Sequence, residues 1–336
     1  MERKLASIRE IKEIFPIEGA DAIEVAVVDG WKVVTKKGEF KPGDLCVYFE
    51  IDSFLPIREE FEFLRKSSYK KMGDTEGFRL KTIRLRGQLS QGLLTPIHIL
   101  PLGEMVHVGQ DVTDMLSVVK YEPPIPAELA GKVKGGFPSF IRKTDEERVQ
   151  NLADQYPYYC LRSDHQFYAT EKLDGSSATF YLHNGGFGVC SRNLELLETE
   201  ENTFWKVARQ MDLENKLKSL GRNICFQGEL IGEGVQGNRY KIKGQTVKFF
   251  NIFDIDKQER VQVREFVEIL ESLALDYVPF IHIPFLLPNT IQAMLEFAED
   301  SSMLNRNVQR EGIVVRSFDT TISFKAISNK FLLEEK

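Results

Sequence analysis

The 336-residue sequence has few of the residues that build metal and disulfide sites. Its four cysteines, Cys46, Cys160, Cys190 and Cys225, are scattered, and none forms a Cys-X-X-Cys pair. This spacing argues against a zinc knuckle or a disulfide frame and for a reducing compartment. The five histidines form no His-X-X-His or His-Glu-X-X-His pair, so a histidine-based metal site is not expected.

Long hydrophobic runs are also missing. Residues 1–15 contain no apolar stretch of signal-peptide length, and no segment approaches the roughly 18 apolar residues that span a membrane. We therefore expect an intracellular protein of the cytoplasm or nucleus, neither secreted nor membrane-bound, and we expect a monomer. The sequence has no GxxxxGKS/T loop and no GxGxxG pattern after an expected strand, so neither of these phosphate-binding loops is predicted.

The composition is otherwise that of an ordinary globular protein, with 42% hydrophobic and 28% charged residues. The chain is long for one core, so two domains are expected. A net charge of −6 does not indicate a nucleic-acid binder, but the charge is uneven. Residues 62–86 hold eight basic side chains (Arg65, Lys66, Lys70, Lys71, Arg79, Lys81, Arg84 and Arg86) against three acidic ones (Glu62, Asp74 and Glu76).

The basic segment contains the pattern RLKTIRLRG at residues 79–87. If this pattern forms a strand, Arg79 and Lys81 share one face, and Arg84 and Arg86 share a face. Such a strand, with aromatic residues close by for stacking, is suited to following a nucleic-acid backbone. The alternative is a solvated sheet edge that its charges protect from pairing.

The two halves of the chain have different patterns. Residues 1–120 are expected to form short strands joined by tight turns, which is typical of a small β-barrel or sandwich. Proline and glycine are frequent in residues 121–140, which we interpret as a linker. Residues 141–336 mix strands and helices, which favours an α+β domain built on antiparallel sheet. The clearest strands expected in the first half are 23–28, 31–35 and 45–49.

Several local signals place the elements of the second half. A capping-box pattern at Thr144–Glu147 predicts a helix through about residue 152, and Asn202 is the expected N-cap of another. Helical spacing of apolar residues predicts helices at about 266–273 and 291–295. The Asn184-Gly-Gly sequence predicts a hairpin turn. The expected strands are 176–183, 187–191, 224–231, 247–254, 312–317 and 321–326.

A lysine and an aspartate lie two residues apart in the strand-like run from Thr170 to Phe180. On a strand, Lys172 and Asp174 would point the same way and Glu171 the other way. The glycine that follows Asp174 lets the backbone approach a ligand or bend sharply. Taken alone, the pattern fits a surface ion pair beside a bulge equally well.

Further charged residues interrupt otherwise apolar strands, namely Glu229, Asp254, Glu311 and Lys325. A buried charge without a partner is costly, so such positions usually pair or serve a site. Lysines bind phosphates, and carboxylates bind hard divalent metal ions. These charged residues together therefore favour a site for phosphate chemistry over several unrelated salt bridges. Asp254 is expected to have a structural role.

The sequence Glu171-Lys-Leu-Asp-Gly-Ser-Ser177 resembles motif I, KxDG, of the covalent nucleotidyltransferases, which include the ATP-dependent polynucleotide ligases and mRNA capping enzymes. Further motifs of that family have counterparts in the same order across about 160 residues. They resemble Ser191-Arg192-Asn193, Gln227–Leu230, Phe249–Ile255, Glu311–Arg316, and Lys325 with Lys330.

The resemblance implies a reaction in three steps. Lys172 attacks the α-phosphorus of ATP and expels pyrophosphate, the AMP passes to a 5′-phosphate end, and a 3′-hydroxyl displaces it to seal the strand. The implied nucleotide contacts are Glu171, Lys172, Arg192, Glu229, Lys325 and Lys330, with Phe253 stacking on adenine.

The resemblance also implies divalent cations, Mn²⁺ or Mg²⁺, with two ions expected and manganese favoured. Asp174, Glu229 and Glu311 are the candidates for holding one ion, directly or through water. Such an ion would lower the pKa of the attacking lysine by opposing its positive charge. The family's second motif V lysine usually stands where this chain has Ile327, and we assign its role to Lys330.

Domain order narrows the resemblance. Only six residues follow Lys330, so the additional domain is expected at the N-terminus, as in RNA ligases that carry an OB domain there. The resemblance therefore implies an OB-type barrel over 1–120, the linker 121–140 and a nucleotidyltransferase domain over 141–336. It implies an RNA ligase that joins 3′-hydroxyl and 5′-phosphate ends. The alternatives are a DNA-nick ligase, a GTP-using guanylyltransferase, and a nucleic-acid-binding protein that has lost activity.

Overall fold

The computed structural model describes residues 4–101, 103, 105–122, 132–161 and 166–334. The chain divides into two compact units. The first unit comprises Met1–Pro124, Val149–Tyr156 and Leu332–Lys336, and the second comprises Ile125–Arg148 and Pro157–Phe331. The first unit therefore includes two short segments, 149–156 and 332–336, that were expected in the second domain.

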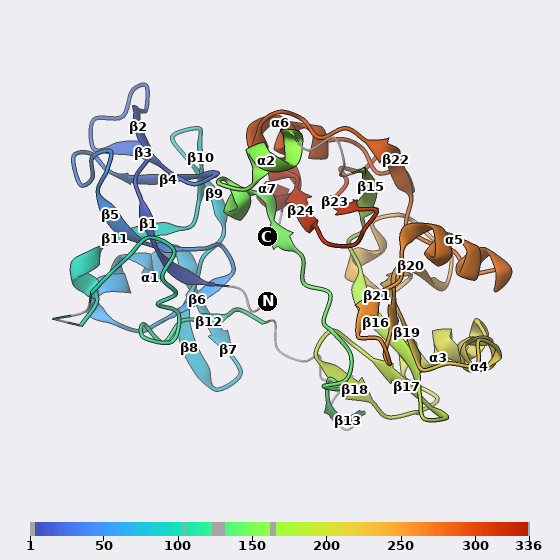
Figure 1. Cartoon of the computed structure of the whole chain (residues 1–336). Helices are drawn as coiled ribbons and strands as arrows, with labels where there is room; N and C mark the ends of the chain where they lie inside the picture. The colour runs from blue at the N-terminus through green and yellow to red at the C-terminus, as the bar shows by residue number, and fades with distance from the viewer. Residues whose placement is uncertain (1–3, 102, 104, 123–131, 162–165, 335–336) are drawn as a thin grey trace. The chain divides into compact units, whose positions relative to one another are not determined.

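The first unit is built mainly of short antiparallel strands (Figure 1). The strands expected at 23–28, 31–35 and 45–49 are confirmed. The sheets are β1 (Ala6–Glu10)–β5 (Leu45–Phe49)–β11 (Leu93–Pro96), β2 (Glu13–Pro16)–β3 (Ile23–Val28)–β4 (Trp31–Lys36), β12 (Val119–Lys120)–β6 (Ser53–Pro56)–β8 (Thr75–Arg79)–β7 (Tyr69–Met72), and β10 (Gln88–Gln91)–β9 (Thr82–Leu85). The short helices are η1 (Glu59–Leu64), α1 (Arg65–Ser68), η2 (Ile97–Ile99) and η4 (Val149–Leu152).

The first unit has its own hydrophobic core. Trp31 and Tyr48 are buried on one side of it, and Phe49 and Phe78 are buried in a neighbouring cluster. The Trp31 indole N–H donates a hydrogen bond of 2.7 Å to the side chain of Asn151. This contact helps to explain why a segment near residue 150 belongs to the first unit, because a buried indole N–H needs an acceptor.

The single strand expected at residues 79–87 is interrupted in the structure. Arg79 ends β8, and the backbone N–H of Leu80 donates to Ser53 at 2.9 Å while its side chain is buried. The chain then enters β9, and Arg86 lies in the turn after it with φ 50°. The four basic residues therefore lie on two strands and their ends, not on the faces of one strand, because burial of Leu80 turns the chain.

The second unit contains two sheets (Figure 1). The described strands form an α+β architecture on mostly antiparallel sheet, as expected, and β14 and β24 pair in parallel. The seven-stranded sheet is β13 (Val133–Gly136)–β18 (Leu194–Leu196)–β17 (Gly186–Cys190)–β16 (Ser176–His183)–β19 (Ile224–Gly232)–β20 (Gln245–Asp254)–β21 (Glu259–Arg260). The five-stranded sheet is β14 (Glu147–Arg148)–β24 (Ser323–Ile327)–β23 (Gly312–Ser317)–β15 (Phe167–Lys172)–β22 (Phe280–Phe285).

Helices accompany these sheets. They are α2 (Tyr156–Leu161), α3 (Thr203–Gln210), α4 (Leu213–Ser219), η5 (Gln236–Asn238), α5 (Val263–Ser272), α6 (Ile291–Ala298) and α7 (Asn329–Glu334). The expected cap at Asn202 is confirmed, since its side chain accepts hydrogen bonds from the N–H groups of Phe204 and Trp205. The expected helices near 266–273 and 291–295 correspond to α5 and α6. No described helix is long and apolar enough to cross a membrane.

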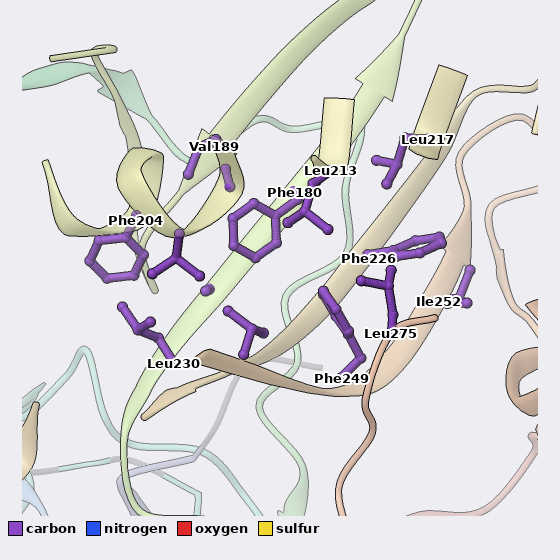
Figure 2. Packing of buried hydrophobic residues seen from close by; sticks show 14 of the residues in the cluster. Phe180, Val189, Phe204, Leu213, Leu217, Phe226, Leu230, Phe249, Ile252 and Leu275 are labelled. Atoms are coloured by element: carbon purple, nitrogen blue, oxygen red, sulfur yellow. The ribbon is translucent and has the colours of Figure 1, made fainter. Parts of the chain in front are cut away.

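One face of the seven-stranded sheet carries the largest core cluster of the second unit. Figure 2 shows Phe180, Phe226 and Phe249, from β16, β19 and β20, among the side chains of this cluster. The Phe226 and Phe249 rings meet edge to face with centroids 5.6 Å apart. Leu213 and Leu217 of α4 cover the same face. Because this face is filled with apolar side chains, polar residues that alternate with them on the same strands point to the other face.

Two expectations for the second unit are corrected by the structure. Residues 144–152 do not form one α-helix, because Glu147–Arg148 is strand β14 and a helical segment, the short 3₁₀ helix η4, begins only at Val149. The acidic side chains that suggested a capping box make long-range contacts, among them an ion pair of 2.8 Å between Glu146 and Arg316. Of the linker expected at 121–140, residues 123–131 lie outside the described residues. Residues 133–136 form strand β13 of the seven-stranded sheet.

Candidate active site

Lys172 is the last residue of β15 in the five-stranded sheet. This strand pairs with β23 so that Lys172 lies opposite Gly312, which places Glu311 beside the end of β15. The Lys172 ammonium donates a hydrogen bond of 2.6 Å to the Glu311 carboxylate. The lysine side chain is 29% exposed and the glutamate 16%, so the pair lies at the edge of the protein interior and solvent.

The chain leaves the five-stranded sheet directly after Lys172. The run from Thr170 to Phe180, which looked like one strand, is two strands in different sheets, because β15 ends at Lys172 and β16 begins at Ser176. Gly175 lies in the crossing. A Cβ atom there would stand 2.4 Å from the Leu230 carbonyl oxygen, so the close approach of the two backbones requires glycine. The expectation from the sequence that Gly175 allows a close backbone approach is therefore confirmed.

Asp174 is held in this crossing by its backbone. Its N–H donates a hydrogen bond of 2.6 Å to the hydroxyl of Tyr240, a residue that lies between η5 and β20 and is itself buried. Tyr240 was not singled out from the sequence, since nothing in its local pattern distinguishes it from a core tyrosine. The contact links the crossing that follows Lys172 to a segment more than 60 residues away.

Glu229 approaches the same place from the seven-stranded sheet. It alternates with the core residues Gly228 and Leu230 along β19, so it points to the face opposite the phenylalanine cluster. Burial, together with the negative charges of Glu311 and Asp174, raises the pKa of Glu229 to about 8. These carboxylates therefore lie close enough to repel one another, and Lys172 only partly offsets their charge.

The electrostatic setting of Lys172 follows from the same groups. Burial by itself would lower the pKa of Lys172, but the carboxylates of Glu311 and Glu229 outweigh burial and raise it. The lysine is therefore an ammonium at neutral pH when these carboxylates are its only partners. A nucleophilic role requires that another positive charge enter the cluster and weaken this ion pair.

The carboxylates fit an incoming cation by their charge. Glu229 and Glu311 act on Lys172, and Asp174 and Glu311 act on Glu229, whose raised pKa is the mark of excess negative charge. Among the described residues, however, no three His, Cys, Asp or Glu side chains come close enough together to hold a metal ion on their own. Oxygen atoms from water or from a substrate would have to complete the coordination of an ion there.

Arg192 and Lys325 meet at a carboxylate that the sequence analysis did not select. The Lys325 ammonium donates a hydrogen bond of 2.8 Å to Asp145, and the Arg192 guanidinium lies 3.6 Å from the other oxygen of the same carboxylate. Lys325 is buried on β24, whereas Arg192 follows β17 and is largely exposed. Arg192 also affects the pKa values of Lys172 and Glu229, which places it in the same cluster of charges.

The next residue, Glu146, was also missed. It accepts hydrogen bonds from Arg316, at 2.8 Å, and from Arg260, at 3.1 Å, as well as from the hydroxyl of Ser323. Although burial opposes ionisation, the two guanidinium groups lower the pKa of Glu146 from 4.5 to about 2. Local pattern gave no signal for this residue, because its partners lie far away in the sequence.

Three further predicted site residues have other surroundings. Lys330, at the start of α7, pairs with Glu299 at 3.4 Å and is 63% exposed. Glu171 is buried and accepts the N–H of Met303 at 2.8 Å, and burial raises its pKa. Phe253 is buried in a cluster with Tyr181 and Phe140. The nucleotide contacts assigned to these three residues stay predictions.

The basic residues of the first unit differ in how they are engaged. Arg79 pairs with Asp52 at 3.1 Å and stacks on the ring of Tyr121, and its side chain is only 16% exposed. Arg84 and Arg86 are exposed, and Arg84 donates to the Gly87 carbonyl at 3.0 Å. Lys81 is partly buried. The exposed members of this group are therefore better placed than Arg79 to meet a polyanion.

Two sequence-family models match the chain. A model of an OB-fold domain matches residues 5–97, and a model described as RNA ligase matches residues 165–330. The second range contains Lys172, Glu229, Glu311 and Lys325. Together with the similarity to solved structures, these matches show that the chain belongs to the RNA ligase family and carries an N-terminal OB-fold domain.

Among solved structures, the chain is similar to Naegleria gruberi RNA ligase. The complex of that protein with PPi is 46% identical over 98% of both chains, with a TM-score of 0.91. A glutamate-to-alanine variant solved with ATP and Mn has the same identity, coverage and TM-score. A lysine-to-methionine variant with AMP and Mn is 46% identical over 98% of both chains, with a TM-score of 0.92. No curated protein sequence matches the chain.

Proposed function

We propose that the protein is an ATP-dependent RNA ligase that forms a covalent adenylate on Lys172. The observation that carries this proposal is the contact of 2.6 Å between Lys172 and Glu311, in a cluster with a second, partly buried glutamate, Glu229. A lysine at the end of a strand, between carboxylates of two sheets, suits attack on a phosphate. The relatives solved with ATP, AMP and Mn support the nucleotide and the metal.

In the first step the Lys172 amine attacks the α-phosphorus of ATP. A phosphorus–nitrogen bond forms while the bond to the pyrophosphate oxygen breaks, and pyrophosphate leaves with the electron pair. The ammonium must first lose a proton, which at pH 7 costs roughly 4.6 kcal/mol for an unperturbed lysine pKa of about 10.4. Glu311 and Glu229 add to this cost in the free protein, because they raise the pKa of Lys172.

Lys325 and Arg192 are the groups that neutralise the nucleotide phosphates in this proposal. Both lie within reach of one carboxylate, so both can turn toward one anionic group. Bound Mn²⁺ or Mg²⁺ would supply positive charge that weakens the hold of the carboxylates on Lys172 and neutralises phosphate charge. Asp174, Glu229 and Glu311 would hold it through carboxylate oxygens, which hard divalent cations prefer.

The remaining steps join two RNA ends. The AMP moves from Lys172 to a 5′-phosphate, and the hydroxyl at a 3′ end then attacks that phosphate and displaces AMP. We assign Arg84 and Arg86 to the RNA backbone, with Lys81 and Arg79 beside them, because the first two are exposed. We further propose a monomer inside the cell, a setting compatible with four free cysteine thiols.

The covalent intermediate gives the primary test. The wild-type protein and Lys172→Ala would be incubated with α-labelled ATP or GTP and manganese, followed by denaturing electrophoresis. We expect an acid-labile label on the wild-type protein with ATP alone and none on the variant. If folded wild-type protein takes no label from either nucleotide, the proposal fails.

A sealing assay then defines the ends. We expect the protein to join RNA strands that carry a 3′-hydroxyl and a 5′-phosphate, and to leave strands with a 5′-hydroxyl unjoined. Matched DNA strands, single or in a nicked duplex, serve as the comparison. Preferred sealing of a DNA nick would contradict the RNA assignment while leaving the adenylate chemistry in place.

A further inference from the structure

The residues from Arg142 to Glu146 form a strap without regular secondary structure just before β14. Its first residue is fastened by the Gln227 side chain, whose amide donates to the Arg142 carbonyl at 3.0 Å. Its last residue, Glu146, is fastened by two arginines and a serine hydroxyl. Because both ends are tied to buried groups, the position of the strap is well defined.

Asp145 lies inside the strap, and its carboxylate contacts two cations. One oxygen of its carboxylate accepts from Lys325 at 2.8 Å, and the other lies 3.6 Å from the Arg192 guanidinium. These two cations come from β24 and from the end of β17, in different sheets. A single anion therefore bridges the two sheets, as a phosphate group with several oxygens would.

The two sides of this contact differ in their exposure. The Lys325 side chain is 10% exposed, so its nearly buried ammonium would lose a close counter-charge if Asp145 left and nothing replaced it. The Asp145 side chain is 37% exposed, so its carboxylate can turn toward water with little penalty. Because the lysine is more buried than the aspartate, loss of this contact costs the lysine more than it costs the aspartate.

A nucleotide phosphate and the Asp145 carboxylate cannot both use these cations at close range. Both are negative, and two like charges within a few ångströms of one another repel strongly in a partly buried site. Binding of a phosphate at Lys325 and Arg192 therefore requires that Asp145 give up its contacts. The hydrogen bonds that hold the strap at Arg142 and at Glu146 do not involve the Asp145 side chain, so they can persist while this happens.

We infer that Asp145 is a positioning residue that occupies the phosphate site of the empty protein and is displaced by the nucleotide. It keeps Lys325 and Arg192 aligned and compensated before ATP arrives, and it competes with the phosphate for them. This inference rests on the proposed function, since it takes the phosphates of ATP as the competing anion. Removing the carboxylate should therefore tighten ATP binding, which is the opposite of what loss of a structural contact would do.

The test compares ATP affinity with and without the Asp145 charge. Affinity for ATP with manganese would be measured by calorimetry in the Lys172→Ala background, where no adenylate forms. We expect Asp145→Asn to tighten binding by roughly three- to tenfold, the range for losing a partly exposed competing ion pair. Asp145→Ser serves as a second neutral variant with the same expectation, and Asp145→Glu should bind ATP as weakly as the background.

Two controls make the result specific to Lys325. Glu147→Gln removes a neighbouring negative charge that accepts from the Arg148 N–H instead, and it should leave ATP affinity unchanged. Adding Lys325→Ala should abolish the difference between Asp145→Asn and its background, because the contested cation is gone. With Lys172 present, Asp145→Asn should lower the KM for ATP in adenylate formation without raising kcat.

The outcomes separate this inference from the proposed function. Tighter binding that depends on Lys325 supports displacement of Asp145. Weaker or unchanged binding by folded Asp145→Asn and Asp145→Ser overturns it, even if the wild-type protein still forms an adenylate. Failure of the wild-type protein to take up label from ATP is a different result and counts against the proposed function itself.

Discussion

At the scale of single residues, the site is set by backbone contacts as much as by charges. Lys172 and Asp174 are separated by a change of sheet, and the crossing between them is fixed by Gly175 and by the Tyr240 hydroxyl. A displacement of about 1 Å in a reacting group can reduce a rate by roughly a hundredfold. Residues that touch only the backbone of the crossing are therefore expected to influence the chemistry at Lys172.

Tyr240→Phe tests the hydroxyl contact. The substitution keeps the buried ring but removes the hydroxyl that accepts from the Asp174 N–H, so we expect a loss of about 1–2 kcal/mol in the free energy of unfolding. Adenylate formation should slow as well, because this hydrogen bond no longer helps to position the Asp174 backbone. Urea unfolding and the labelling rate with ATP would measure the two effects.

The matched control for this substitution is Tyr277→Phe. Its hydroxyl contacts the exposed Glu271 side chain at 3.3 Å, so its removal should change stability by less than about 0.5 kcal/mol. Equal behaviour of the two variants would contradict a special role for the Tyr240 hydroxyl.

Gly175→Ala tests the close approach of the crossing to β19. An added Cβ would lie 2.4 Å from the Leu230 carbonyl oxygen, which cannot move without disturbing the sheet, so we expect destabilisation of about 2–3 kcal/mol. Gly135→Ala is the comparison, because no atom lies within 4 Å of the Cβ position there. Urea unfolding of both variants would refute the steric argument if their stabilities matched.

At the scale of elements, the sequence predicted what depends on local pattern. Alternation and the Asn184 turn located the β16–β17 hairpin, and helical spacing located α5 and α6. The family motifs singled out Lys172, Glu229 and Glu311 from the sequence, and the pKa effects among these three residues agree with one cluster.

The local sequence pattern could not predict the conformation of the strap, residues 142–146. Asp145 and Glu146 looked like part of a capping box, yet their partners Lys325 and Arg316 follow 180 and 170 residues later. Propensity and capping describe neighbours along the chain and carry no information about such partners, so a tertiary ion pair overrides them. The same limit applies to the run after Thr170, where one apparent strand serves two sheets.

The ion pairs of Glu146 predict how the stability of the protein depends on pH in acid. The pKa of this glutamate falls from 4.5 to about 2 on folding, so its ionised form stabilises the folded protein. That stabilisation, roughly 3 kcal/mol, is fully present above pH 4.5 and is lost as the pH falls from there toward 2. Glu146→Gln should therefore be less stable than the wild-type protein at pH 7, and the gap should narrow below pH 4.5.

Urea unfolding at several pH values between 7 and 3 would measure this gap. Glu268→Gln is the control, because Glu268 forms an exposed pair with Arg264 on one helix and should contribute less than about 0.5 kcal/mol at any pH. A gap between Glu146→Gln and the wild-type protein that stays constant with pH would rule out the buried ion pairs as its cause.

At the scale of the whole molecule, the two units hold different parts of the proposed reaction. Every candidate for the nucleotide chemistry, from Glu171 to Lys330, belongs to the second unit. The basic segment at residues 62–86 belongs to the first. Adenylate formation needs no RNA, whereas sealing does, so substitutions in the first unit should separate the two activities.

The double variant Arg84→Ala, Arg86→Ala tests this separation. Both side chains are exposed, so their loss should leave the fold intact and retain labelling by ATP while RNA binding and sealing weaken. If each arginine neutralises one phosphate of a single strand, the slope of log K against log salt concentration should fall in magnitude by about 1.4. Lys71→Ala is the control, because Lys71 is paired with Glu76 at 2.9 Å and should change that slope less. An unchanged salt slope in the double variant would show that the β9–β10 hairpin does not contact the RNA backbone. The other basic residues of segment 62–86 would then be the candidates for that contact.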